Sequence, residues 1–169
     1  MINTARRQFL RGRVRSAERA GPLSVRLPWT ISESHFLDQC SRCGDCLPAC
    51  TESLISMGDG GYPILDFNQG ECTFCQDCVR ACKQPLFDLE NPPWQNKASV
   101  QSHCLALQQV FCQNCKDACE ARAIQFRYGL HGIPTPEIQA ELCTGCGACI
   151  APCPNDSMQI LPLPHGVTT

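Results

Sequence analysis

The chain has 169 residues and a formal net charge of −2, and 16 of its residues are cysteine. A cysteine content this high is typical of disulfide scaffolds and metal-cluster proteins. The chain has only 11 aromatic side chains, so a large hydrophobic core is excluded and cross-links or metals must stabilise the fold. No apolar run approaches the ~18 residues of a membrane span, so we expect no transmembrane segment.

Residues 1–30 are predicted to form a flexible, basic, Arg-rich arm. The first 26 positions hold one acidic residue, Glu18, and seven of the 14 basic residues: Arg6, Arg7, Arg11, Arg13, Arg15, Arg19 and Arg26. The rest of the chain has seven basic and 15 acidic residues, so arm and body carry opposite charge. The arm is either a solvated terminus or a contact for an acidic partner, nucleic acid or an anionic lipid surface.

The paired Arg6-Arg7 before Phe9-Leu10 resembles the core of a twin-arginine export signal. A working signal also needs an apolar stretch of about 7–15 residues. Residues 11–19 instead contain four arginines, so we expect a cytoplasmic protein. In a reducing compartment, abundant cysteine favours metal ligation over disulfides.

The 16 cysteines fall into four groups of four. Three groups share the spacing C-x2-C-x2-C-x3-C, and the third group is stretched. The groups are Cys40, Cys43, Cys46 and Cys50; Cys72, Cys75, Cys78 and Cys82; Cys104, Cys112, Cys115 and Cys119; and Cys143, Cys146, Cys149 and Cys153.

The regular spacing is typical of [4Fe–4S] ligation, and Pro154 completes the C-x2-C-x2-C-x3-C-P motif in the fourth group. Three thiolates two residues apart can wrap one face of a cubane. The fourth cysteine then leaves on a short helical turn and, in two-cluster ferredoxins, reaches the other cluster. Small residues within the wrap allow close approach, as at Gly44, Gly145 and Gly147.

The third group leaves two readings open. Cys104 stands eight positions before Cys112, so a looped-out segment would have to deliver its thiolate to a cluster. Alternatively, Cys104 is a buried or free thiol and that cluster is incomplete. We therefore expect three to four [4Fe–4S] clusters.

Other uses of the cysteines fit the spacing less well. Two C-x2-C knuckles suffice for one structural zinc ion, whereas three of the four groups gather more thiolates than one zinc uses. Haem attachment would need C-x2-C-H, which is absent from the sequence. A disulfide scaffold would need an oxidising compartment.

An internal duplication accompanies the cysteines. The first and second groups recur as the third and fourth at offsets of about 70 residues, and apolar residues occupy the fifth and seventh positions after every group. This alternation predicts a short strand after each group, at Ile55 and Met57, Phe87 and Leu89, Ile124 and Phe126, and Met158 and Ile160. Lead-in strands are expected at 64–67 and around Ile138. The predicted unit is strand, Cys loop, short helix, strand.

Two such units make one module, so the predicted fold is α+β: tandem bacterial two-[4Fe–4S] ferredoxin-like modules. We expect the first module at 31–90, a Pro-rich linker at 91–97 and the second module at 98–165. Crossed ligation would join Cys40, Cys43, Cys46 and Cys82 on one cluster, and Cys72, Cys75, Cys78 and Cys50 on the next. A nested pairing of outer with inner groups is the alternative.

The sequence contains no nucleotide-binding loop and no arrangement of catalytic residues, so we expect no enzymatic activity. The four histidines are scattered. His103, beside Cys104, is expected to be an exposed loop residue, and Trp29 and Trp94 are expected to be packing or contact residues.

Together these motifs resemble the NapF family, the ferredoxin-type proteins of periplasmic nitrate reductase systems. The resemblance covers the Arg-rich arm, the stretched third group with Cys119-Glu120, and the segments 33–37, 60–63 and 143–149.

The resemblance implies an accessory protein in the cytoplasm. Its partner would be the precursor of the molybdenum-containing nitrate reductase catalytic subunit, whose maturation it would assist by donating electrons or helping to assemble an iron–sulfur centre. It implies no nucleic-acid partner. The competing hypotheses are a general electron-transfer ferredoxin subunit of another oxidoreductase and a zinc-stabilised binding module.

Overall fold

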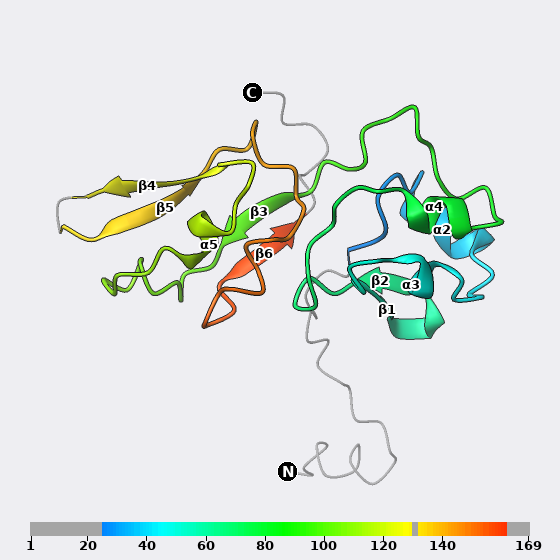
Figure 1. Cartoon of the computed structure of the whole chain (residues 1–169), viewed down its shortest axis with the longest axis horizontal. Coiled ribbons are helices and arrows are strands. Elements are labelled where there is room, and N and C mark those ends of the chain that lie inside the picture. The colour runs from blue at the N-terminus through cyan, green and yellow to red at the C-terminus, as the bar shows by residue number, and fades with distance from the viewer. Residues whose placement is uncertain (1–24, 130–131, 162–169) are drawn as a thin grey trace, which may run out of the picture.

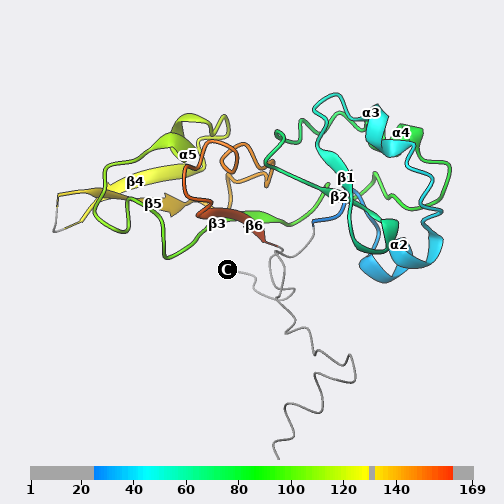
Figure 2. The same cartoon turned by 90° about the horizontal axis from the view of Figure 1, so that it is seen from below.

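The computed structural model describes residues 25–129 and 132–161. Short helices and strands are separated by long loops, and two groups of elements lie side by side (Figures 1 and 2). The helices are α2 (Glu33–Gln39), α3 (Cys46–Ala49), η1 (Asp59–Gly61), α4 (Asp77–Ala81) and α5 (Asn114–Asp117). The strands are β1 (Ile55–Met57), β2 (Pro63–Leu65), β3 (Lys97–Val100), β4 (Ile124–Tyr128), β5 (Pro134–Ile138) and β6 (Met158–Leu161).

The strands pair within each half of the chain and repeat one topology. β1 pairs antiparallel with β2, and β4 pairs in the same way with β5. In the second half β3 also pairs with β6. Its counterpart in the first half is a single bridge between Thr30 and Phe87. The duplication read from the cysteines therefore extends to strand pairing.

The strands predicted after the first, third and fourth cysteine groups are confirmed as β1, β4 and β6. The strand predicted at Phe87 and Leu89 is wrong, because only Phe87 is paired. Its partner segment, around Thr30, offers one bridge. Leu89 and Glu90 then lie in a turn, in which the Asp88 carboxylate accepts hydrogen bonds from the Glu90 amide and the Asn91 side chain, and this turn ends the pairing.

The short helix expected within the fourth group is also wrong. Residues 148–152 form turns, with the amides of Ile150 and Cys153 donating to carbonyls three residues earlier. Pro152 lacks the amide hydrogen that an α-helical bond to Ala148 would require. Helix α2, in contrast, was not predicted. Its N-cap is Ser32, whose hydroxyl accepts from the His35 amide, and it buries Phe36.

The predicted arm extends too far toward the C-terminus. Leu27 and Trp29 are buried, and Val25 bridges to Leu65. Arg26 binds Glu33 through two guanidinium nitrogens and donates to the Pro63 carbonyl at 3.2 Å. Residues 25–30 therefore belong to the first module. The remainder of the predicted arm, residues 1–24, lies outside the described residues.

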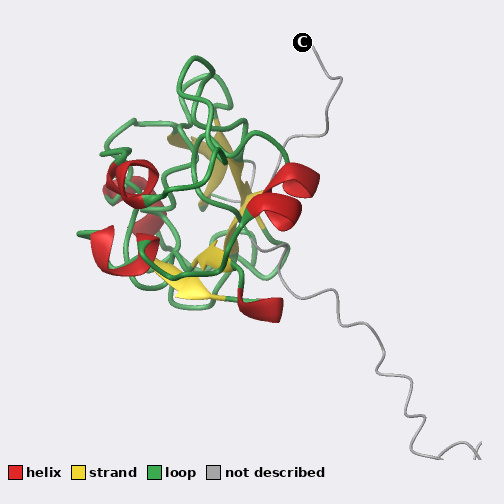
Figure 3. Ribbon diagram, turned by 90° about the vertical axis from the view of Figure 1, so that its right-hand side faces the viewer, coloured by secondary structure: helices red, strands yellow, loops and turns green. Residues whose placement is uncertain are grey.

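Loops dominate the structure between these small sheets (Figure 3). The buried core is correspondingly modest, and it includes cysteines beside aliphatic residues such as Leu54, Ile124 and Ile160. Within the described ranges, we find no helix with the length and hydropathy of a membrane span. Thiols from the four cysteine groups surround the space beside this core.

Candidate metal centres

All 16 cysteines are free thiols, and the structure gathers them into four sets of four around separate cavities. Each set combines three cysteines of one group with the last cysteine of the other group in the same module. Site I has Cys40, Cys43, Cys46 and Cys82; site II has Cys72, Cys75, Cys78 and Cys50; site III has Cys143, Cys146, Cys149 and Cys119; and site IV has Cys104, Cys112, Cys115 and Cys153. This is the crossed arrangement, and the nested alternative does not occur.

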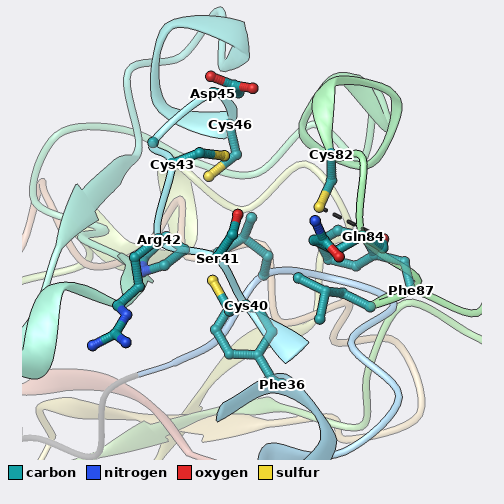
Figure 4. Close-up of a pocket in the computed structure, with 14 residues that line it drawn as sticks. Phe36, Cys40, Ser41, Arg42, Cys43, Asp45, Cys46, Cys82, Gln84 and Phe87 are labelled. Atoms are coloured by element: carbon teal, nitrogen blue, oxygen red, sulfur yellow. Dashed lines mark hydrogen bonds between the residues drawn. The ribbon is translucent and has the colours of Figure 1, made fainter. Parts of the chain in front are cut away.

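Site I shows how the elements present the thiols (Figure 4). Cys40 follows the end of α2, Cys46 begins α3, and Cys82 ends α4 on the opposite side of the cavity. The ring of Phe36 and the side chain of Phe87 form an apolar wall. Three short helices and the loop between α2 and α3 thus hold the four thiols around one cavity, although Cys40 and Cys82 are 42 residues apart in the sequence.

The structure places Cys104 in site IV, with Cys112, Cys115 and Cys153. Cys104 is buried, and the intervening residues form turns, with the Gln108 amide donating to the Cys104 carbonyl at 3.0 Å. The stretched spacing is therefore accommodated by a compact loop outside the cavity. The loop exposes Val110 and Phe111 to solvent, while Leu105 lines the site.

The four thiols of each site line a shared cavity without meeting at one point. Within the part of the chain that the structure describes, no three His, Cys, Asp or Glu side chains converge closely enough for a single ion. Zinc would draw four sulfurs to about 2.3 Å from one point. A cubane, which binds a thiolate at each of four iron corners, suits this wider arrangement.

Burial makes the charged thiolate form of these cysteines unfavourable unless a positive charge lies nearby. Desolvation raises the pKa of Cys46, Cys72 and Cys115 to about 11, and that of Cys78 and Cys149 to about 12. Burial is the largest cause of each of these pKa shifts, and the charge of neighbouring thiols contributes to them. At neutral pH such groups remain protonated unless a metal replaces the proton. Binding of a cationic metal at these sites would therefore release the thiol protons.

Hydrogen bonds to sulfur are a feature that the sequence analysis missed. The amides of Ala98 and Ala123 lie 3.3 Å from the sulfurs of Cys143 and Cys119, both in site III. In site IV the Ser157 amide donates to the Cys153 sulfur at 3.3 Å, and the Ser157 hydroxyl lies 3.2 Å from the same atom.

Burial opposes ionisation of Cys153, but these bonds outweigh it and lower the pKa of that thiol. Ser157 is only 1% exposed, so solvent does not compete for its hydroxyl. The available signal was a serine four residues after the last cysteine.

Comparison with known families agrees with this geometry. Two matches to family models described as "4Fe-4S dicluster domain" cover residues 39–86 and 110–157. The second match begins after Cys104, so the assignment of that cysteine to site IV comes from the structure alone. No solved structure matches the chain. The protein is thus an iron–sulfur protein of the ferredoxin class, with two tandem dicluster domains.

More specific relatives cover almost the whole chain. This chain is 41% identical over 159 residues to "Ferredoxin-type protein NapF" of Haemophilus influenzae, and the match covers 90% of each chain. The Escherichia coli K12 protein of the same name is 43% identical over 154 residues, covering 90% of this chain and 92% of the relative. A more distant relative, "Ferredoxin-type protein NapG" of E. coli K12, is 29% identical over 198 residues, spanning 94% of this chain and 86% of its own. The chain belongs to the NapF family of ferredoxin-type proteins.

Proposed function

We propose that the protein binds four [4Fe–4S] clusters, one at each of sites I–IV, and acts in electron transfer. The single observation that carries this proposal is the crossed gathering of all 16 thiols into four equivalent sets. When bound, such clusters supply one-electron chemistry. The chain provides the thiolates. Phe36 and Phe87 exclude part of the solvent from site I, and backbone amides donate to sulfurs of sites III and IV.

Iron and acid-labile sulfide measured on anaerobically purified protein test this proposal. Four cubanes require about 16 irons and an equal amount of sulfide per chain. About 12 irons would show that site IV is not filled and would contradict the four-cluster proposal. Zinc without sulfide would reject iron–sulfur binding altogether and favour a zinc-stabilised module.

We further propose that the protein works in the cytoplasm on the precursor of the molybdenum-containing catalytic subunit of periplasmic nitrate reductase. It would assist the maturation of that subunit before export, by electron donation or by assembly of an iron–sulfur centre. Membership of the NapF family supports this role. The Arg-rich segment 1–24 would supply a basic contact for an acidic surface of the partner.

A pull-down with the full chain, its clusters intact, tests the partner. Precursor carrying its export signal should be retained, and a matched variant with the arginines of 1–24 replaced by glutamine should retain less. A cluster-loaded chain that fails to retain the precursor would reject this role.

A general electron-transfer subunit of another oxidoreductase is the second candidate. A relative from Methylorubrum extorquens, 29% identical over 171 residues, is named "Methylamine utilization ferredoxin-type protein MauM", so related chains occur in a different system. This candidate predicts that removal of the basic segment leaves function intact. It also predicts that the reduced protein passes electrons to a partner other than the nitrate reductase precursor.

A further inference from the structure

The two modules meet through the cysteine loops of sites II and III. The amide of Cys72, in site II, donates a 2.8 Å hydrogen bond to the carbonyl of Cys146, in site III. Each of these residues also contributes a thiol to its own site. One hydrogen bond therefore joins the backbones of two proposed cluster ligands in different modules. Among the described residues, no other pair of sites in different modules shares such a bond.

Gly147 makes this close approach feasible. A Cβ atom built on Gly147 would lie 2.0 Å from Cδ1 of Phe67 in the first module. Phe67 is 5% exposed, so its ring has little freedom to move away. Any larger residue at position 147 must push the two modules apart or distort the loop that follows Cys146.

The equivalent glycine in the first motif has no such role. Gly44 follows Cys43 as Gly147 follows Cys146, and both have positive φ, +80° and +87°. A Cβ atom at Gly44 would meet no atom within 4 Å. No protein atom crowds Gly44, whereas the crowding at Gly147 comes from the other module.

A second set of contacts holds the two modules together where the cysteine loops of sites II and III meet, a contact region that we call the seam. The indole nitrogen of Trp94 donates to the Thr144 carbonyl at 2.8 Å, between Cys143 and Gly145. The Trp94 ring also packs edge-on against Phe67 and Phe74, with centroids 6.4 and 5.5 Å apart. Phe74 stands between Cys72 and Cys75 and lines site II. Aromatic side chains thus pack beside both cysteine loops.

We infer that this seam is an electron-transfer junction that joins the two modules into one conductor, with Gly147, Phe67 and Trp94 as its positioning residues. The inference rests on the proposed occupation of sites II and III by clusters. With clusters bound, Cys50, Cys72, Cys75 and Cys78 would hold one redox centre and Cys119, Cys143, Cys146 and Cys149 the other. A single electron from an external low-potential one-electron donor would pass between them, oxidising one cluster and reducing the other, with no bond formed or broken and no proton moved. The Cys72–Cys146 hydrogen bond lies on the route between the two thiolates.

Dipolar EPR spectroscopy of the dithionite-reduced holoprotein tests the junction, because spin–spin interaction between reduced clusters depends on their separation. We compare the wild type with Gly147→Ala, the double variant Phe67→Ala/Gly147→Ala, and the matched control Gly44→Ala. The control carries the same change at the same motif position and backbone conformation. Iron and sulfide are measured on every sample.

We expect Gly147→Ala to lose part of the spin–spin interaction between sites II and III and the double variant to regain it. Gly44→Ala, which carries the same backbone strain in site I, should keep the wild-type interaction between sites II and III. Identical interactions in all four proteins at equal iron content would overturn the inference. If Gly147→Ala fails to retain site III iron, Trp94→Phe decides, since it removes the indole donor and part of the ring that packs on Phe67 and Phe74 but changes no residue of a Cys loop. A Trp94→Phe spectrum equal to wild type would then overturn the junction. A wild type without iron and sulfide would instead reject the proposed function.

Discussion

At the scale of single residues, a few polar contacts to sulfur distinguish the sites from one another. Ser157 directs both an amide and a hydroxyl at Cys153, while the site III sulfurs receive backbone amides only from Ala98 and Ala123 among the described hydrogen bonds. A hydrogen bond to a thiolate stabilises the more negative, reduced cluster, and it is one of the means by which proteins tune reduction potentials. The hydroxyl of Ser157 is therefore expected to influence site IV specifically.

Replacing Ser157 with alanine should lower the potential of one cluster. The lost hydrogen bond is worth about 0.5–1.5 kcal/mol, which corresponds to roughly 20–60 mV for one electron. Potentiometric titration followed by EPR measures the shift. Iron content should stay at the wild-type value, because the thiolates are unchanged. A potential equal to that of wild type would show that the hydroxyl does not act on the cluster.

Cys104 offers a second test at this scale. If it is a ligand of site IV, Cys104→Ser should reduce iron by about four per chain, the content of one cubane. Cys112→Ser provides the matched control, because both residues line the same site. The double variant should lose no more iron than either single variant. Iron unaffected by Cys104→Ser would assign that cysteine a packing role instead.

At the scale of elements, helix α2 links the first cysteine to the body of the first module. Phe36 is completely buried on one face of the helix, lines site I, and lies beneath the guanidinium of Arg26 at 5.1 Å from its ring centroid. Leu37, the next residue, is 37% exposed. Only one face of α2 packs against the module and positions Cys40. Substitutions at the adjacent residues Phe36 and Leu37 should therefore differ greatly in their effect on stability.

Phe36→Ala should destabilise the first module by about 3–5 kcal/mol, since it removes a large buried side chain. Leu37→Ala, the matched control in the same helix, should cost less than about 1 kcal/mol. Bleaching of the cluster absorption in guanidinium measures both effects, and only Phe36→Ala should shift the midpoint markedly. Equal midpoints for the two variants would contradict the assigned packing of α2.

At the scale of the whole molecule, stability depends on the four sites rather than on a continuous apolar core. The three sheets found in residues 25–129 and 132–161 have two strands each, and such small sheets are not stable alone in water. Several core residues are cysteines that line the sites. Binding of clusters is therefore expected to supply much of the folding free energy.

Removal of iron by a chelator under reducing conditions should unfold most of the chain. Circular dichroism should lose its native signal as the cluster absorption disappears, and hydrogen exchange should become rapid at β1–β2 and β3–β6. Reconstitution with iron and sulfide should restore the signal, whereas zinc alone should not. A chelated chain that keeps its native spectrum would show that the polypeptide core suffices.

The sequence by itself predicted the cysteines that the structure gathers into four sites, the repeated unit and three of its strands, because cubane chemistry fixes local cysteine spacing and a two-residue period marks a half-buried strand. It left open the place of Cys104, and it assigned Leu27 and Trp29 to the arm. Only the tertiary structure decided the crossed sets, the start of the first module and the seam at Gly147 and Phe67. These features depend on contacts between residues far apart in the chain, where packing and backbone hydrogen bonds choose among arrangements that the local spacing permits equally.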